Sequence, residues 1–173
     1  MDETRHIYIL LTKHSDNFSL LILALIRGYY SHASIGFDEE MGRYYSFTRR
    51  GFRVEEPHKI CLKRKNVECV LYRVPVSQQA YDSMRQRLAF YHESGSDWKF
   101  NILGVFFGIA RVPFLQRKHK RFCSQFVAEI LEYGKEKRLQ KRSSVAFPDD
   151  FVKAALSKPA FLGTLEGLAE SAF

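Results

Sequence analysis

The chain has 173 residues, of which 46% are hydrophobic and 14% aromatic, and its formal net charge is +8. This composition supports a sizeable buried core and excludes ordinary disorder for the body of the protein. The basic balance favours anionic partners such as nucleic acid, phosphorylated ligands or a membrane surface, although it also serves solubility alone. The N-terminus is unlike a signal peptide and no apolar run is long enough to span a bilayer, so we expect a cytoplasmic protein.

Taken in chain order, the predicted elements alternate between strands and helices. Apolar and β-favouring runs predict strands at 6–13, 31–38, 44–50 and 66–76, with a final strand at 158–170. Capping residues and three-to-four apolar spacing predict helices at 15–28, 77–94, 98–114, 122–133 and 147–156. A turn at Gly42 makes a hairpin of the second and third strands. No repeat or linker interrupts the series, which predicts a single α+β domain over 1–173.

The three cysteines are Cys61, Cys69 and Cys123. Their odd number and their spacing support neither a disulfide framework nor a zinc site, so we expect reduced thiols. Cys123 falls in the first turn of the helix at 122–133, on its apolar, inward-facing side. Free N–H groups there carry partial positive charge, which favours a thiolate and can stabilise an oxyanion. A buried structural cysteine fits the same helix face, so the helix alone leaves both interpretations open.

The hairpin supplies a histidine on a small, polar strand face. His32, Ser34 and Gly36 share this face through the two-residue period of a strand, and apolar residues occupy the other face. A turn near residue 40 places Ser46 opposite or diagonal to His32, where its hydroxyl can orient the imidazole. A nucleophile, a base and an orienting group form the set that cysteine hydrolases use. We therefore expect the Cys123 helix to pack its N-terminus against this face.

These segments occur in a familiar order. The series "SHASIGFD", "RYYSFT", "FCSQFVAEIL", "FPDDF" and "PAFLGTLEG" resembles the circularly permuted NlpC-like branch of the papain-like superfamily, from Ser31 to near the end of the chain. Relatives in that branch include lecithin:retinol acyltransferase-like enzymes and bacterial thiol amidases or peptidases. The resemblance implies a papain-like fold, an antiparallel sheet packed against a nucleophile-bearing helix. It also implies Cys123 as nucleophile and His32 as base, with Ser46 at the third polar position, where relatives often carry a histidine or a carboxylate.

The expected function is that of a thiol hydrolase of amidase or peptidase type, which works through an acyl-enzyme and needs no metal or organic cofactor. One alternative is an acyltransferase acting on a lipid or another acyl substrate. An alternative of a different class is a non-catalytic papain-like module that binds an anionic partner. The expected partners are an acyl- or amide-containing substrate and, through basic clusters, an anionic ligand or membrane surface. No motif for specific nucleic-acid recognition is present.

Basic clusters occupy 63–65, 117–121 and 135–142. The second cluster adjoins Cys123, so we expect Lys118, Lys120 and Arg121 to favour its thiolate and to attract an anionic substrate. The acidic pair Asp149 and Asp150 suits a helix start. The remaining histidines lie in polar or basic surroundings and are expected at the surface: His6, His14, His58, His92 and His119.

Overall fold

The computed structural model describes residues 4–40, 42–94, 98–109, 119–135, 139–154 and 158–171. Its centre is a six-stranded sheet in the order β4-β3-β2-β1-β5-β8, and every neighbouring pair is antiparallel. The strands are β1 (Thr4–Lys13), β2 (His32–Phe37), β3 (Tyr44–Thr48), β4 (Gly51–Glu55), β5 (Glu68–Ser77) and β8 (Pro159–Thr164). The short strands β6 (Lys99–Phe100) and β7 (Lys120–Arg121) form a separate parallel pair.

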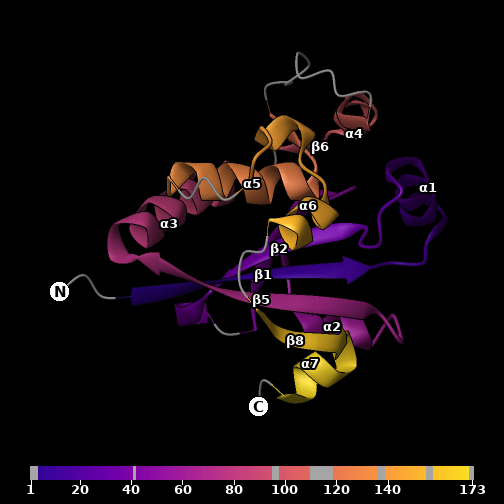
Figure 1. The fold of residues 1–173 in the computed structure, drawn as a ribbon, viewed down its shortest axis with the longest axis horizontal. Coiled ribbons are helices and arrows are strands. Elements are labelled where there is room, and N and C mark those ends of the chain that lie inside the picture. Colours follow the sequence, from indigo (N-terminus) through magenta and orange to yellow (C-terminus); the bar gives the residue numbers. More distant parts are fainter. Residues whose placement is uncertain are drawn as a thin grey trace.

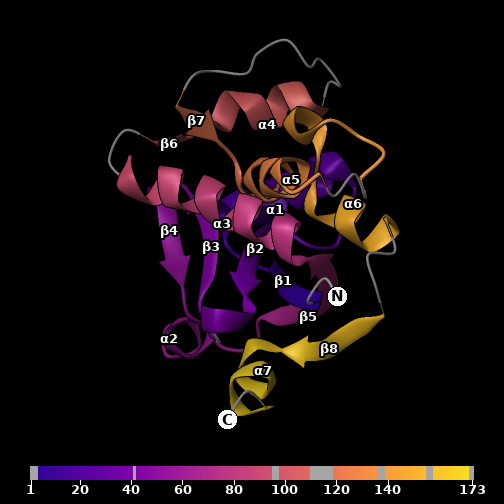
Figure 2. The same ribbon diagram turned by 90° about the vertical axis from the view of Figure 1, so that its left-hand side faces the viewer.

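Helices cover both faces of the sheet, which makes the protein α+β as the sequence predicts. They are α1 (Asn17–Ile26), α2 (Pro57–Cys61), α3 (Gln78–Glu93), α4 (Ile102–Ile109), α5 (Cys123–Tyr133), α6 (Pro148–Lys153) and α7 (Leu165–Ser171), with 3-10 turns η1 (Asp38–Glu40) and η3 (Ser143–Val145). Figure 1 shows α3 and α5 on one face and α2 and α7 on the other. Seen from one end in Figure 2, the sheet separates these two helical layers.

The main core lies between the sheet and the pair α3 and α5. Ile7 and Ile35 from the strands meet Phe126 and Ile130 from α5, and all four side chains are fully buried. Burying a side chain of this size stabilises the fold by about 1.5–3 kcal/mol. The alternation of β2 explains the arrangement, because its odd-numbered residues all point to this core. The helix that starts at Cys123 is thereby fixed against β2 and β3.

A second, smaller core lies on the opposite face, under α2 and α7. It includes Cys61 from α2, Cys69 and Leu71 from β5, and Leu165 and Leu168 from α7. A third apolar cluster joins Ile22 of α1, Val105 of α4 and Phe122 at the start of α5. The elements that surround Cys123 are thus tied together by side-chain packing.

Several sequence expectations need correction at the ends of elements. The strand expected over 44–50 stops at Thr48, and a tight turn with Gly51 at φ 89° starts the additional strand β4. The final strand expected over 158–170 ends at Thr164, and its second half is the helix α7. The strand expected over 66–76 is β5, which includes Pro75 and continues to Ser77. The helix expected over 98–114 is described only as Ile102–Ile109, and 110–118 lies outside the described residues.

The caps of two helices follow their sequence signals. Asp16 accepts the Ser19 N–H at the start of α1, and Ser77 accepts the Ala80 N–H at the start of α3, which satisfies donors that lack an intrahelical partner. In the ranges that the structure describes, none of the helices combines the length and apolar character needed to cross a membrane.

Candidate active site

The candidate nucleophile is the first residue of α5. Cys123 is 7% exposed, and Phe122 precedes it as an N-cap residue that makes no side-chain capping bond. The N–H groups of a first helical turn have no intrahelical acceptor. The helix start at Cys123 therefore presents backbone donors that no capping side chain occupies.

The structure brings His32 to this cysteine. His32 is the first residue of β2; its imidazole and the Cys123 thiol line the same cleft, and each group shifts the pKa of the other. Its Nε2 lies 2.9 Å and 3.0 Å from the two carboxylate oxygens of Glu55, at the end of β4. Because Nε2 faces Glu55, Nδ1 is the ring nitrogen left for the thiol. Three residues far apart in sequence thus form a chain from thiol to imidazole to carboxylate.

The electrostatics of the pair favour its ionised form. Burial opposes charge on His32, but the Glu55 carboxylate and the hydrogen bond to Cys123 outweigh it and hold the pKa of His32 well above its ordinary value. Burial also opposes the Cys123 thiolate, yet the hydrogen bond and charge of His32, with the N–H groups of Ala33 and Ser124, lower the pKa of Cys123. Both shifts favour the thiolate–imidazolium form of the pair over the neutral form.

The expected role of Ser46 is wrong in this structure. The β2–β3 pairing has Ile35 opposite Tyr45, a register that puts Ser46 diagonal to His32 as predicted. The Ser46 hydroxyl nevertheless donates to the Ala33 carbonyl at 2.6 Å and is fully buried. This bond satisfies the Ala33 carbonyl, which lies just beyond the last β2–β3 pair. The group that holds the His32 imidazole is Glu55 instead.

The expected docking face of the cysteine helix also needs correction. We predicted that α5 would meet the small face of β2, on which Ser34 and Gly36 lie. Instead α5 packs on the opposite, apolar face, where Ala33 and Ile35 join its core. Burial of a continuous apolar surface decides the packing. The Cys123 thiol reaches His32 because His32 is the terminal residue of its strand.

A second histidine lies beside the first, where the sequence predicts a surface residue. The ring centroids of His14 and His32 are 5.5 Å apart, and His14 Nε2 lies 3.1 Å from Thr12 Oγ1. Burial, together with the charges of His32 and Arg64, lowers the pKa of His14 to about 4. His14 is therefore neutral near pH 7 and adds no second positive charge beside the imidazolium.

Side-chain bonds also fix the segment that leads into β2. The Asp149 carboxylate accepts the Tyr29 N–H at 2.8 Å, and Ser31 Oγ accepts the His14 N–H at 2.8 Å. Asp149 thus ties α6 to the α1–β2 connection. Gly28 has no room for a side chain, since a Cβ there would lie 2.2 Å from an Asp149 carboxylate oxygen. Asp150, in contrast, caps α6 by accepting the Phe147 N–H.

A cleft of about 220 Å³ opens onto the thiol. Its apolar walls include Phe18, Ile22 and Phe100, and its polar wall includes Arg49 and Arg64. It is smaller than the cavities that usually enclose a drug-sized ligand, so it fits a short acyl chain or amino-acid side chain. Asp16 and Glu55 also line it, so its polar wall carries both signs of charge.

A larger cavity of about 380 Å³ lies on the other face of the sheet, among Tyr8, Gly36, Tyr44, Phe161 and Leu168. None of the three cysteines lines it. Chemistry rather than size therefore selects the cleft at Cys123 as the candidate active site.

The structure bears on only part of the prediction for the basic cluster next to the cysteine. The Arg121 guanidinium donates to Glu129 at 2.7 Å and lies 5.2 Å from the Trp98 ring, so its charge is paired within the fold. Lys118 lies outside the described residues, and the largest effects that lower the pKa of Cys123 come from His32, Ala33 and Ser124. The thiolate is favoured by His32 and backbone donors instead.

Glu55 and His14 are the site residues that sequence reasoning missed. The alternation in "GFRVE" after a turn at Arg49 and Arg50 is a short strand signal that could have added β4 and its terminal carboxylate. No comparable signal marks His14, whose burial depends on how α1 folds back over the end of the sheet.

Comparison with known proteins assigns no family. No protein-family model matches the chain, and no curated protein matches it significantly. The geometry of the site is therefore the basis for the proposals below.

Proposed function

We propose that the protein is a cysteine hydrolase with a permuted papain-like fold, which cleaves an acyl bond of an amide, ester or thioester. The observation that carries the proposal is the ordered chain Cys123–His32–Glu55 at an uncapped helix start, beside a cleft. Nucleophile, base and orienting group in hydrogen-bond sequence are the arrangement that activates a thiol.

The proposed reaction begins with attack of the Cys123 thiolate on the acyl carbon, which forms a carbon–sulfur bond. First-turn N–H groups of α5 stabilise the negative oxygen of the tetrahedral intermediate. His32 donates its proton to the leaving amine, alcohol or thiol as the original acyl bond breaks. It then takes a proton from the water that attacks the thioester; Cys123 leaves as a thiolate and the proton stays on His32, which restores the starting pair. Glu55 keeps the imidazole oriented and supports its positive charge throughout.

Acyl transfer is the second candidate, because the molecule that takes the acyl group from Cys123 is determined by what can enter the cleft, and not by the Cys123–His32 pair. The cleft walls from α1 and β6 are apolar, which favours an acyl chain and a non-aqueous acceptor over bulk water. A non-catalytic binding module is the alternative of another class. It requires no reactive thiolate, so covalent chemistry at Cys123 separates it from both enzymatic functions.

Acyl-enzyme trapping tests the proposal. Wild-type protein is mixed with a panel of short-chain p-nitrophenyl esters and peptide anilides, quenched with acid and analysed as intact protein by mass spectrometry. We expect the acyl mass on wild-type protein and its absence from Cys123→Ala. The matched control is Cys69→Ala, which removes a buried cysteine of the second core and should still be acylated. Equal turnover by Cys123→Ala and wild type would overturn the mechanism.

A further inference from the structure

Two neighbouring helices expose an unusual amount of apolar surface. On α1, Leu20, Leu21 and Leu25 are 42–49% exposed, and on α4, Ile102, Leu103 and Phe106 are 42–45% exposed. Neither helix contains a charged residue in its sequence, "NFSLLILALI" or "ILGVFFGI". Single exposed apolar residues are common, but a contiguous group of large ones marks an interaction surface.

The two helices form one surface rather than two separate ones. Ile22 of α1 and Val105 of α4 pack in the same buried cluster. Phe18, in the first turn of α1, meets Phe100, just before α4, with ring centroids 6.1 Å apart. Figure 1 shows both helices at the end of the molecule where β1 leads into α1. We call the six exposed residues of α1 and α4 the apolar end.

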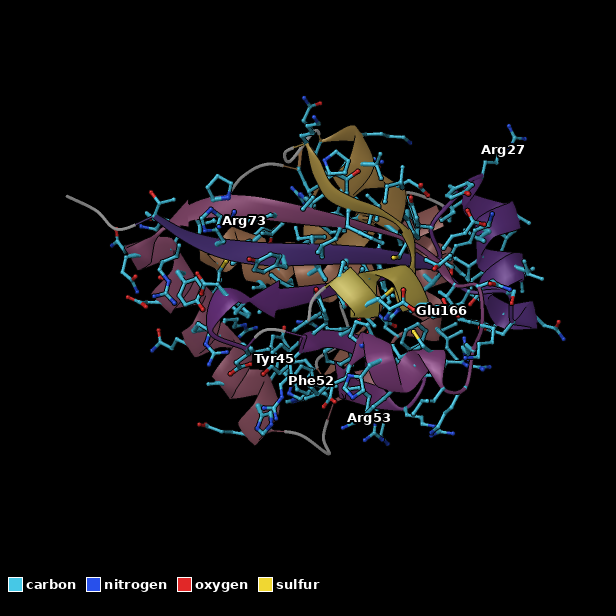
Figure 3. All side chains as sticks on the ribbon, turned by 90° about the horizontal axis from the view of Figure 1, so that it is seen from below. Arg27, Tyr45, Phe52, Arg53, Arg73 and Glu166 are labelled. Atoms are coloured by element: carbon cyan, nitrogen blue, oxygen red, sulfur yellow. The ribbon has the colours of Figure 1, made fainter. Side chains whose placement is uncertain are left out.

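Basic side chains border the apolar end. Arg27 follows α1 and projects away from the protein in Figure 3. The Arg49 guanidinium lies 5.4 Å from the Phe18 ring, and exposed Lys99 precedes α4. The acidic residue at the start of α1, Asp16, is already bound to the Ser19 N–H and to Arg64. The surface therefore has an uncharged apolar centre and a cationic margin.

We propose that the apolar end docks on the surface of a bilayer that contains anionic phospholipid. Short helices with large apolar residues insert to the level of the headgroups and upper acyl chains, and basic neighbours add attraction to anionic lipid. With ten and eight residues, α1 and α4 fit this shallow position. The charge complementarity favours an anionic bilayer over a second, equally basic copy of the chain.

Docking in this orientation has a consequence for the cleft. Phe18, Ile22 and Phe100 belong to the same two-helix region and also line the cleft at Cys123. The bound membrane would therefore lie at the mouth of the candidate active site. The docking itself does not depend on the chemistry of Cys123, so the two proposals can fail separately.

Vesicle flotation tests the docking surface. The probes are phosphatidylcholine vesicles with and without phosphatidylglycerol, and circular dichroism verifies that each variant is folded. Wild type and Cys123→Ala should bind the anionic vesicles equally. The double variants Leu21→Ser/Leu25→Ser and Ile102→Ser/Phe106→Ser should bind them at least about tenfold more weakly, since each loses several inserted methyl or methylene groups. Arg27→Ser/Lys99→Ser should lose about fivefold per charge removed.

The matched control is Leu62→Ser/Leu162→Ser, which removes two still more exposed leucines, 78% and 72%, outside the apolar end. It should bind as wild type does. Equal loss in this control, undiminished binding by the α1 and α4 variants, or no binding of wild type to anionic vesicles would each overturn the proposal. The proposal would also be overturned if the wild type bound no vesicles but associated with itself, and the same substitutions dissociated it. Normal docking by a protein without hydrolase activity would support the inference while removing the proposed function.

Discussion

At the scale of single residues, the protonation state of Cys123 depends on opposing electrostatic effects. Burial disfavours the Cys123 thiolate, and the adjacent imidazolium favours it. The imidazolium depends in turn on Glu55, whose carboxylate stabilises its charge. Removing the charge of Glu55 should therefore make both the His32 imidazolium and the Cys123 thiolate less stable, whereas removing the Ser46 hydroxyl should not.

The substitution Glu55→Gln keeps a side chain of similar shape but removes the charge. We expect kcat/KM to fall by about 10²-fold, the scale of general acid–base effects. The rate should rise with pH as Cys123 loses its proton and fall as imidazolium does. Because Glu55 raises the pKa of His32, the variant's descending limb should move to lower pH. The measurement is the pH profile of kcat/KM on the best substrate from the trapping panel.

Ser46→Ala is the comparison variant. It removes one hydrogen bond to Ala33, which costs about 1 kcal/mol of stability, and it should leave the pH profile in place. If Ser46→Ala shifted the descending limb and Glu55→Gln did not, the assignment of the orienting residue would be reversed.

His14 makes a separate prediction about stability. Its pKa is about 4 in the folded protein and near 6.5 when unfolded. Between those values the unfolded chain binds more protons, so this contribution to stability is present above about pH 6.5 and lost as pH falls towards 4. At 1.36 kcal/mol per pKa unit, the loss is about 2–4 kcal/mol.

Urea unfolding measures this effect at several pH values. The variant His14→Gln should lose less stability than wild type on acidification. Comparing the two proteins cancels much of the opposite contribution of His32, whose raised pKa favours the fold at low pH and ceases to do so as pH rises. His58→Gln, at an exposed histidine, should keep the wild-type pH dependence. The same acid sensitivity in His14→Gln and wild type would show that the surroundings of His14 do not oppose its protonation.

At the scale of elements, the connection between α1 and β2 positions His32. Asp149 accepts the Tyr29 N–H, and Gly28 leaves space for its carboxylate. This connection links α6 with the first residue of β2. A substitution at Gly28 should therefore change the reactivity of Cys123, although Gly28 lies outside the candidate active site.

We expect Gly28→Ala to lower the free energy of unfolding by about 1–3 kcal/mol, the usual cost of overpacking, and to slow alkylation of Cys123. Denaturant unfolding and thiol kinetics measure the two effects. Gly167→Ala in α7 is the control, since its Cβ would meet the Phe161 ring at 3.3 Å, far from the site, and alanine favours a helix. Unchanged stability and reactivity in Gly28→Ala would contradict the described packing.

The elements also show what sequence patterns can and cannot reveal. Helical spacing identifies the face and start of the Cys123 helix, and strand alternation identifies His32, because both signals are local. The link from His32 to Glu55 joins the ends of β2 and β4 across β3, and it depends on how the sheet curves. The split of the last segment into β8 and α7 similarly depends on apolar partners, Leu165 and Leu168, that bury against the second core.

At the scale of the whole molecule, the sheet separates its cysteines into different environments. Cys123 lies at the edge of the main core, whereas Cys61 and Cys69 lie in the second core under α2 and α7. Burial raises the pKa of Cys61 and raises that of Cys69 to about 12. Cys61 and Cys69 can therefore serve as internal controls, because their pKa values are shifted in the opposite direction to that of Cys123.

The most direct measurement is the alkylation rate of each cysteine in the folded protein, followed by iodoacetamide labelling and peptide mass spectrometry across a range of pH. If Cys123 is a thiolate paired with His32, it should react at least about 10²-fold faster than Cys61 and Cys69 at neutral pH, because thiolate is the reactive form. Its rate should persist below the ordinary thiol pKa and fall in His32→Ala. A Cys123 that reacts no faster than Cys69, or only at alkaline pH, would contradict the account and leave Cys123 as a buried structural residue.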